Sequence, residues 1–208
     1  MLEVYRRAHD PARPVVRIDE TTKQLLKETR QPVAMRSGRP RRVDYEYERN
    51  GSASIFMIFA PLEGRREALV TERYTAIDYA HTLEHVADEM FPHAEKIVLV
   101  QDNLNTREPA SLYQAFTPKE ARRLTERFEW RYTPKHGRRL DLDESELGVL
   151  SPQCLDRRIG EMESLRGEVA AWVVDRNKNQ ARADRRFTTD DARVKFKALY
   201  PIFPGQNG

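Results

Sequence analysis

Residues 96–105, Lys-Ile-Val-Leu-Val-Gln-Asp-Asn-Leu-Asn, contain an apolar run that stops abruptly at polar residues. The four consecutive apolar residues 97–100 are mostly β-branched, which is typical of a central strand covered on both faces. Asp102 follows one residue later, together with Asn103 and Asn105. Because ligands in open α/β sheets gather beyond the carboxyl ends of such strands, this stretch predicts a metal or phosphate site at Asp102, with a simple turn cap as the alternative.

A second short apolar run, residues 14–18, leads to Asp19 and Glu20. Two adjacent parallel strands that each end in a carboxylate can hold both side chains within reach of one cation, so Asp19 and Asp102 form a candidate pair. Asp19 and Glu20 also suit the N-cap of a helix over residues 21–27, and the two roles can coexist.

The other strand signals predict an α/β protein with a mixed sheet. Asn50-Gly51 predicts a hairpin between strands over residues 43–48 and 52–61, and residues 67–73 continue it as an antiparallel meander. Alternating side chains predict a further short strand over residues 129–134.

Apolar residues recur at helical spacing between and after these strands. The predicted helices cover residues 75–91, residues 111–128 with an interruption at Thr117-Pro118, a segment that begins at Glu144, residues 161–177 and residues 189–199. The first of them returns the chain to the strand after residue 96 as a crossover connection. It carries His81 and His85 four residues apart, a spacing that can bind zinc, but with no third ligand evident a surface or packing role is favoured.

The charge of the 208-residue chain is balanced, with 36 Lys and Arg against 33 Asp and Glu, but the arginines are clustered. Clusters lie at residues 36–42, 122–127, 135–139 and 182–186. Basic clusters fit a polyanion such as nucleic acid, and a salt-bridged surface is the alternative. The single Cys154 excludes an intrachain disulfide framework, and with no apolar stretch that could cross a bilayer and no signal peptide, a cytoplasmic protein is expected.

Three carboxylates share one arrangement, because Asp19 and Asp102 end apolar strands and Glu144 opens a helix after a strand-like segment. Hard oxygen ligands of this kind suit Mg²⁺, which keeps positions open for water and phosphate oxygens. Such a trio can hold two divalent cations and support phosphoryl transfer.

These features together resemble one family. The meander, the crossover helix, Val-Gln-Asp-Asn-Leu-Asn at residues 100–105, Arg-Tyr-Thr-Pro-Lys-His-Gly at residues 131–137 and the downstream Glu look like the catalytic domain of bacterial insertion-sequence transposases of the mariner-like superfamily. The resemblance implies an RNase H-like fold, in which a mixed sheet of an antiparallel meander plus parallel strands is flanked by helices and carries an Asp-Asp-Glu triad.

The resemblance also implies the chemistry and the partners. Asp19, Asp102 and Glu144 match the three acids, which would hold two Mg²⁺ or Mn²⁺ ions and support cleavage and transfer of DNA strands. The residues expected to contact double-stranded DNA are Lys135, His136, Arg138 and Arg139. A homodimer on paired DNA ends and a nucleoid-associated location without a membrane follow from the same resemblance.

The chain departs from the family pattern just before Glu144. In the family, His-Gly is followed by Ser-Trp-Leu-Asn and, after two residues, the catalytic Glu, whereas this chain has Arg-Arg-Leu-Asp at residues 138–141. Asp141, Asp143 and Glu146 are therefore rival assignments for the third acid. The alternative function is an impaired remnant that only binds nucleic acid.

One catalytic domain is expected over residues 1–200, followed by a frayed tail over residues 201–208. Full-length family members carry helix-turn-helix modules ahead of the catalytic domain. No such module is expected here, because the first predicted strand begins near residue 14.

Overall fold

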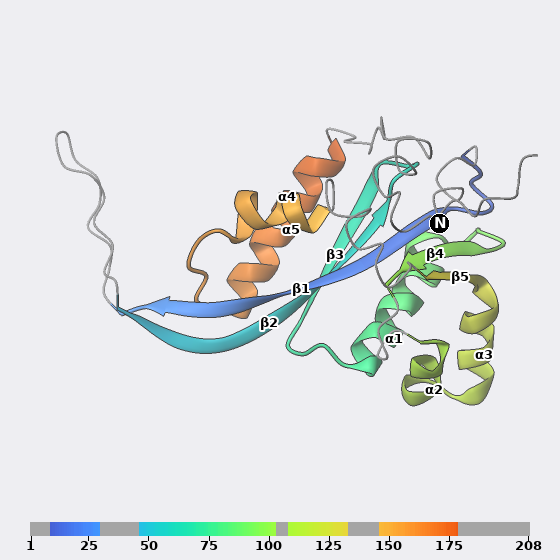
Figure 1. Cartoon of the computed structure of the whole chain (residues 1–208), viewed down its shortest axis with the longest axis horizontal. Coiled ribbons are helices and arrows are strands. Elements are labelled where there is room, and N and C mark those ends of the chain that lie inside the picture. Colours follow the sequence, from blue (N-terminus) through green and yellow to red (C-terminus); the bar gives the residue numbers. More distant parts are fainter. Residues whose placement is uncertain (1–8, 30–45, 103–107, 133–145, 179–208) are drawn as a thin grey trace, which may run out of the picture.

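The computed structural model describes residues 9–29, 46–102, 108–132 and 146–178. In this part of the chain, five strands form one mixed sheet in the order β3-β2-β1-β4-β5 (Figure 1). The strands are β1 (Val15–Glu28), β2 (Tyr47–Ala60), β3 (Arg65–Thr71), β4 (Ile97–Gln101) and β5 (Phe128–Tyr132). The first three form an antiparallel meander, β4 runs parallel to β1, and β5 runs parallel to β4. The predicted combination of a meander with parallel strands is confirmed.

Helices cover both faces of the sheet (Figure 1). One layer contains α1 (Ala76–His85), which continues as a π-helical turn over Val86–Met90, a 3₁₀ turn over Pro109–Ser111, α2 (Leu112–Ala115) and α3 (Pro118–Arg127). The other contains α4 (Glu146–Leu150), a π-helical turn over Ser151–Leu155, and α5 (Met162–Lys178). Among these described helices, none has the length and apolar character needed to cross a membrane.

The helices predicted over residues 75–91, 111–128 and 161–177 are confirmed. The crossover helix corresponds to α1 with its π-helical turn, and the helix over residues 161–177 corresponds to α5. The break at Thr117-Pro118 separates α2 from α3, and the Thr117 hydroxyl caps α3 by accepting a hydrogen bond from the Glu120 backbone. The helix over residues 189–199, the tail after residue 200 and the helix start at Glu144 lie outside the described residues.

β4 is the buried inner strand that its apolar run predicts. All five of its residues are buried. Ile97 and Leu99 face the α1 layer, whereas Val98 and Val100 pack with Val15 on the opposite face. A strand with two apolar faces has no solvated side, so it occupies the interior of the sheet between β1 and β5.

β1 differs from the prediction beyond Asp19. The helix predicted over residues 21–27 is wrong, because these residues extend β1 and pair with β2, where Thr21 lies opposite Ile55. β2 offers a partner of 14 residues, and the β-branched Thr21 and Thr22 suit an extended backbone. Pairing along this length outweighs the small helix propensity of the segment.

The hairpin predicted at Asn50-Gly51 is also wrong. β2 runs through both residues, and its hairpin partner is β1. The register shifts here, since Gln24 pairs with Ser52 and Leu26 pairs with Arg49, which leaves one extra residue in β2. Gly51 has a φ of 89°, so the dipeptide supplies its left-handed conformation to a β-bulge rather than to a turn.

The carboxyl end of β4 is tied to both neighbouring elements. Tyr79 of α1 is fully buried, and its hydroxyl donates to the side-chain oxygen of Gln101, the last residue of β4. Tyr132 of β5 lies opposite Gln101 and is hydrogen-bonded to the same side chain. Burial raises the pKa of Tyr79 well above its usual range, so the phenol stays protonated as a donor.

The arginines of α3 pair within the protein. Arg123 binds Asp88 through two hydrogen bonds of 2.8 and 2.6 Å and also bonds to Glu120. Arg127 donates to the Ala87 carbonyl, and Arg122 pairs with a glutamate one turn along the helix. This cluster fits the salt-bridged alternative, because its charges hold α3 against the π-helical turn after α1.

We expect Tyr79→Phe to destabilise the fold by about 1–3 kcal/mol, because the buried Gln101 side chain loses a hydrogen-bond donor. Urea unfolding measures the change. Tyr113→Phe is the matched control, since Tyr113 is 52% exposed. Removal of its hydroxyl should change the free energy of unfolding by less than about 0.5 kcal/mol. Equal effects of the two substitutions would contradict the buried network.

We expect Arg123→Gln to flatten the acid dependence of stability. The hydrogen bonds from Arg123 hold the pKa of Asp88 below its usual range. A carboxyl group with a lowered folded-state pKa stabilises the protein above its unfolded-state pKa of about 4, and this contribution is lost as the pH falls through the lower, folded-state value.

The test is urea unfolding at about pH 6 and about pH 3. The stability gap between the unchanged chain and Arg123→Gln should narrow at the lower pH. Lys119→Gln removes a charge from an exposed position on the same helix. The difference in the free energy of unfolding between this variant and the unchanged chain should therefore be the same at both pH values. A constant gap for Arg123→Gln as well would refute the role of the pair.

Candidate active site

Asp19 and Asp102 are brought together by the parallel pairing of β1 and β4. Val15 lies opposite Val98, and Arg17 lies opposite Val100. Continued for two residues, the same register places Asp19 opposite Asp102. Neighbouring strands are about 4.8 Å apart, so one cation can contact both carboxylates.

Both aspartates lie on the sheet face that α4 covers. Val16 and Ile18 pack into the α1 layer, so the alternate residues Arg17 and Asp19 face the other side. In β4 the even-numbered residues, Val98 and Val100, face the α4 side of the sheet. The same alternation, continued for two residues, turns Asp102 to that side. Both aspartates are half-buried, which leaves them accessible to an ion or a substrate.

Asp19 is a strand residue with an ordered carboxylate. The expectation that β1 ends at Asp19 is wrong, since the strand continues to Glu28 along β2. The Asp19 carboxylate accepts a hydrogen bond of 3.0 Å from the backbone N–H of Glu20. The parallel pairing with β4 agrees with the prediction, although the Asp19 carboxylate lies in mid-strand.

The first turn of α4 lies beside Asp19. A small cavity of about 20 Å³ is lined by Arg17, Asp19, Met57, Phe59, Glu146 and Leu147. Glu146 is buried and forms ion pairs with Arg66 and Arg176. Two arginines already neutralise this carboxylate, so Glu146 is a poor candidate for the third metal-binding acid.

Several predicted site residues are not described by the structure. They are Asn103, Asn105, Lys135, His136, Arg138, Arg139, Asp141, Asp143 and Glu144. Of the predicted triad, the described residues therefore bring together Asp19 and Asp102. These residues offer carboxylate oxygens, the hard ligands that Mg²⁺ and Mn²⁺ accept, so the pair fits a divalent metal.

A second acidic group lies elsewhere. Ligand atoms of Glu84, Asp88 and Glu120 are within 4.8 Å of one another, on α1, its π-helical turn and α3. Arg123 bonds to Asp88 and Glu120, and His81 lies 3.1 Å from Glu84. These carboxylates are therefore part of an ion-pair cluster that joins the helices.

His81 and His85 do not share a ligand position. His81 contacts Glu84, whereas His85 contacts Glu67 at 2.5 Å and Glu89 at 3.2 Å. The packing role favoured for this pair agrees with these contacts.

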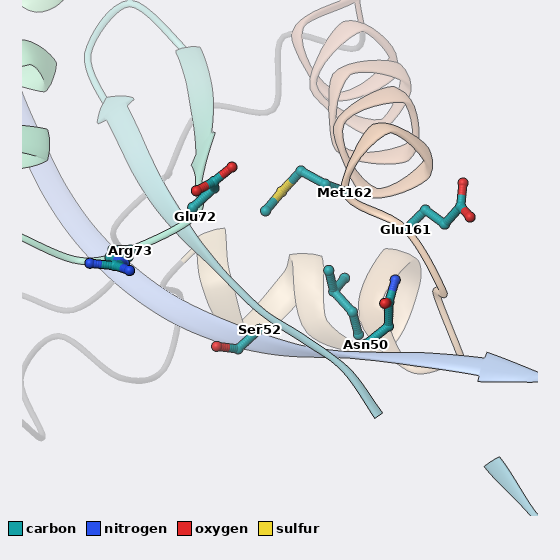
Figure 2. A pocket seen from close by; sticks show the side chains of 7 residues that line it. Asn50, Ser52, Glu72, Arg73, Glu161 and Met162 are labelled. Carbon is teal, nitrogen blue, oxygen red and sulfur yellow. The ribbon is translucent and has the colours of Figure 1, made fainter. Parts of the chain in front are cut away.

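A separate groove lies away from the aspartates. It encloses about 420 Å³ between the β2 bulge, the end of β3 and the start of α5, and its lining residues are Leu25, Asn50, Ser52, Glu72, Arg73, Glu161 and Met162. Figure 2 shows Arg73 and Glu161 at opposite ends of this group. Leu25 lies six residues beyond Asp19 on β1, about 20 Å along the strand, so the groove is separate from the candidate site.

Comparison with known protein families identifies a family that most of this chain matches. Residues 14–166 match the family model described as DDE superfamily endonuclease. No curated protein sequence matches the chain. The matched segment includes Asp19, Asp102 and α4.

Solved structures of Mos1 transposase assemblies share the fold. The Mos1 strand transfer complex gives a TM-score of 0.55 at 13% sequence identity, over 83% of this chain and 50% of that chain. The Mos1 mariner paired end complex with Mn gives a TM-score of 0.53 at 14% identity, over 83% of this chain and 51% of that chain. The Mos1 mariner paired end complex with Mg gives a TM-score of 0.52 at 15% sequence identity, over 87% of this chain and 53% of that chain.

This chain thus spans about half the length of the Mos1 chains. The likeness confirms the predicted RNase H-like fold. The family match covers most of the chain, including the strands that pair the two aspartates. The chain belongs to the DDE superfamily endonuclease family.

Proposed function

We propose that this chain is the catalytic domain of a DNA transposase, which cleaves DNA and transfers the cut strand in a metal-dependent reaction. The observation that supports this most directly is the register of β1 and β4. Continued for two residues beyond the Arg17–Val100 pair, this register would set Asp19 opposite Asp102, on the sheet face that carries the first turn of α4. The family match and the likeness to Mos1 complexes solved with Mn and with Mg agree with the proposal.

The proposed metal-binding and catalytic residues are Asp19, Asp102 and Glu144. Glu144 holds the position of the third acid in the family motif. The rival Glu146 is engaged by two arginines, which favours Glu144 over it. Two bound Mg²⁺ or Mn²⁺ ions would supply activation of the attacking oxygen and stabilisation of the departing one.

The residues of this chain hold and orient the carboxylates. Asp19 is fixed within a paired strand, and its carboxylate accepts the Glu20 N–H. Asp102 follows Gln101, whose side chain is bound by Tyr79 and Tyr132. Such support limits the motion of the two acids, and metal-ligand geometry depends on it.

DNA contacts are proposed for Lys135, His136, Arg138 and Arg139. This segment follows β5, whose last residue, Tyr132, lies opposite Gln101. β5 therefore ends beside the residue that precedes Asp102, and the basic stretch begins three residues later in the sequence. Double-stranded DNA and a homodimer on paired ends are the proposed partners, consistent with the Mos1 paired end complexes, and a nucleoid-associated location follows from the DNA.

A non-catalytic remnant that binds nucleic acid is the second candidate. It is favoured by the departure at residues 138–141, where Arg-Arg-Leu-Asp replaces the family's Ser-Trp-Leu-Asn. This change adds positive charge and removes an aromatic residue, so DNA binding could persist without an organised metal site.

We expect Asp102→Asn to lower Mn²⁺-dependent nicking of supercoiled DNA by at least about 100-fold, because one carboxylate ligand is lost. DNA binding, measured by fluorescence anisotropy, should be retained. Asp156→Asn is the matched control, since Asp156 is exposed and lies after α4, and its nicking rate should stay within about 2-fold. Unchanged nicking by Asp102→Asn would reject the assignment, and absence of nicking by the unchanged chain would favour the remnant.

We expect the double variant Arg138→Gln with Arg139→Gln to reduce the slope of log affinity against log salt by about 2, because each phosphate contact contributes about 1. The measurement is DNA binding at several salt concentrations. The control is Arg122→Gln with Arg123→Gln, which removes two charges already paired on α3 and should leave the slope unchanged. Equal slopes for the two double variants would contradict the proposed DNA contacts.

A further inference from the structure

Two arginines share one carboxylate at the last strand of the sheet. The Glu129 carboxylate accepts a hydrogen bond of 2.6 Å from an Nη of Arg13. It also accepts a hydrogen bond of 3.0 Å from Nε of Arg131, which binds it through an Nη as well. Both arginine side chains are 47% exposed, so positive charge is in excess at an accessible place.

This ion cluster lies on the same sheet face as the candidate acids. Trp130 packs into the α1 layer, so its neighbours Glu129 and Arg131 face the other side. β5, β4 and β1 lie side by side (Figure 1), and Arg131 is opposite Val100, which is in turn opposite Arg17. Arg131 and Arg17 therefore flank β4 in one row across the sheet.

That row is the one next to the acids. Asp102 follows Val100 by two residues, which is about 6.6 Å at the rise of a strand, and neighbouring strands are about 4.8 Å apart. The Cα atom of Arg131 is therefore about 8 Å from that of Asp102. A DNA strand carries one phosphate for about every 3.4 Å of helix axis, so a strand bound at the acids can place a neighbouring phosphate at Arg131.

The fold depends little on these ion pairs. Exposed pairs contribute little to stability because water screens them. β5 is held by its hydrogen-bonded ladder with β4 and by the packing of Phe128 and Trp130 on the α1 layer. Exchange of the Glu129 carboxylate for another anion would therefore leave the strand in place.

Glu129 occupies the arginines as a phosphate would. The hydrogen bonds from Arg131 and Arg13 hold the pKa of the Glu129 carboxyl below its usual range, although burial opposes the shift. Glu129 is therefore a carboxylate at neutral pH. Carboxylates and phosphates both accept hydrogen bonds from the planar fork of a guanidinium, so the two groups compete for the same donors.

The charge of this face depends on a bound cation. The ranges 13–19, 98–102 and 129–131 hold three arginines and three carboxylates. A divalent cation at Asp19 and Asp102 would therefore turn a neutral face into a positive one, which attracts a polyanion.

We propose that Arg131 binds a phosphate of the DNA backbone beside the candidate acids, and that Glu129 holds this arginine until the phosphate replaces its carboxylate. The contact positions the strand over Asp19 and Asp102. This inference rests on the proposed function, because it takes DNA as the ligand of this face.

The test measures DNA binding by the full chain, by fluorescence anisotropy at several salt concentrations. Arg131→Gln should weaken binding by about 10-fold near 0.1 M salt and reduce the slope of log affinity against log salt by about 1, because one phosphate contact is lost. Arg131→Lys keeps the charge and should keep the slope. Mn²⁺ binding, measured by calorimetry, should not change in either variant.

Arg13→Gln is the matched control, because it removes the other ion pair of the same carboxylate. The Ala12 carbonyl accepts hydrogen bonds from the backbone of Glu95 and Lys96, so Arg13 lies at the amino end of β4. That end is about 20 Å along the strand from Asp102. The DNA affinity of Arg13→Gln should stay within about 2-fold of that of the unchanged chain.

Glu129→Gln should give the opposite result. It releases Arg131, so DNA binding should tighten by about 3-fold, a gain that misfolding cannot produce. The gain should disappear when Glu129→Gln is combined with Arg131→Gln.

These variants also define the results that would overturn the inference. Unchanged affinity and slope in Arg131→Gln would exclude the phosphate contact, and equal losses in Arg13→Gln and Arg131→Gln would make the cluster a structural feature. A gain that persists in full in the double variant would show that Glu129 repels DNA rather than holding Arg131. If the unchanged chain binds DNA but does not nick it with Mn²⁺, the proposed catalysis fails, while the same binding data still decide the role of Arg131. If the unchanged chain binds no DNA, both fail.

Discussion

The parallel pairing of β1 with β4 is the constraint on which the candidate site depends. A slip of one residue would turn Arg17 and Asp19 toward the α1 layer, where Phe56 and Leu83 lie buried. Burial of two charged groups among apolar side chains would cost several kcal/mol. The apolar residues of β1 thus pack in the core. Its polar residues disfavour any other register than the one that, continued for two residues, aligns Asp19 with Asp102.

The two layers of helices have different chemistry, and the candidate site belongs to the more polar one. The α1 layer packs on the sheet through a continuous apolar cluster, with its ion pairs at the rim. The α4 and α5 layer combines an apolar part with the buried ion pairs between Glu146, Arg66 and Arg176. A rigid apolar layer on one face therefore supports strands whose other face carries charge, which is a suitable arrangement for binding a cation and a polyanion.

Features that the local sequence pattern determines are predictable in this chain, whereas features that depend on distant partners are not. The apolar run before Asp102 identifies β4 and its carboxyl end, because burial on both faces leaves an unbroken apolar signature. The helix predicted over residues 21–27 and the hairpin turn predicted at Asn50-Gly51 are wrong. Both segments take conformations that depend on the long pairing of β1 with β2. The Glu146 cluster had no local signal at all, since its arginines lie on β3 and α5. An exposed and a buried Glu look alike in a sequence.

The cost of the aspartate pair favours an enzyme over a remnant. Two carboxylates at facing positions of neighbouring strands repel each other, and half-burial reduces the screening by water. Arg17 on the same face compensates in part, but the simplest way to relieve the repulsion would be a neutral residue at either position. A protein that only bound nucleic acid would gain nothing from two converging negative charges, which oppose phosphates. A divalent cation would resolve the conflict, because it would neutralise the carboxylates and make their shared face attractive to a DNA phosphate.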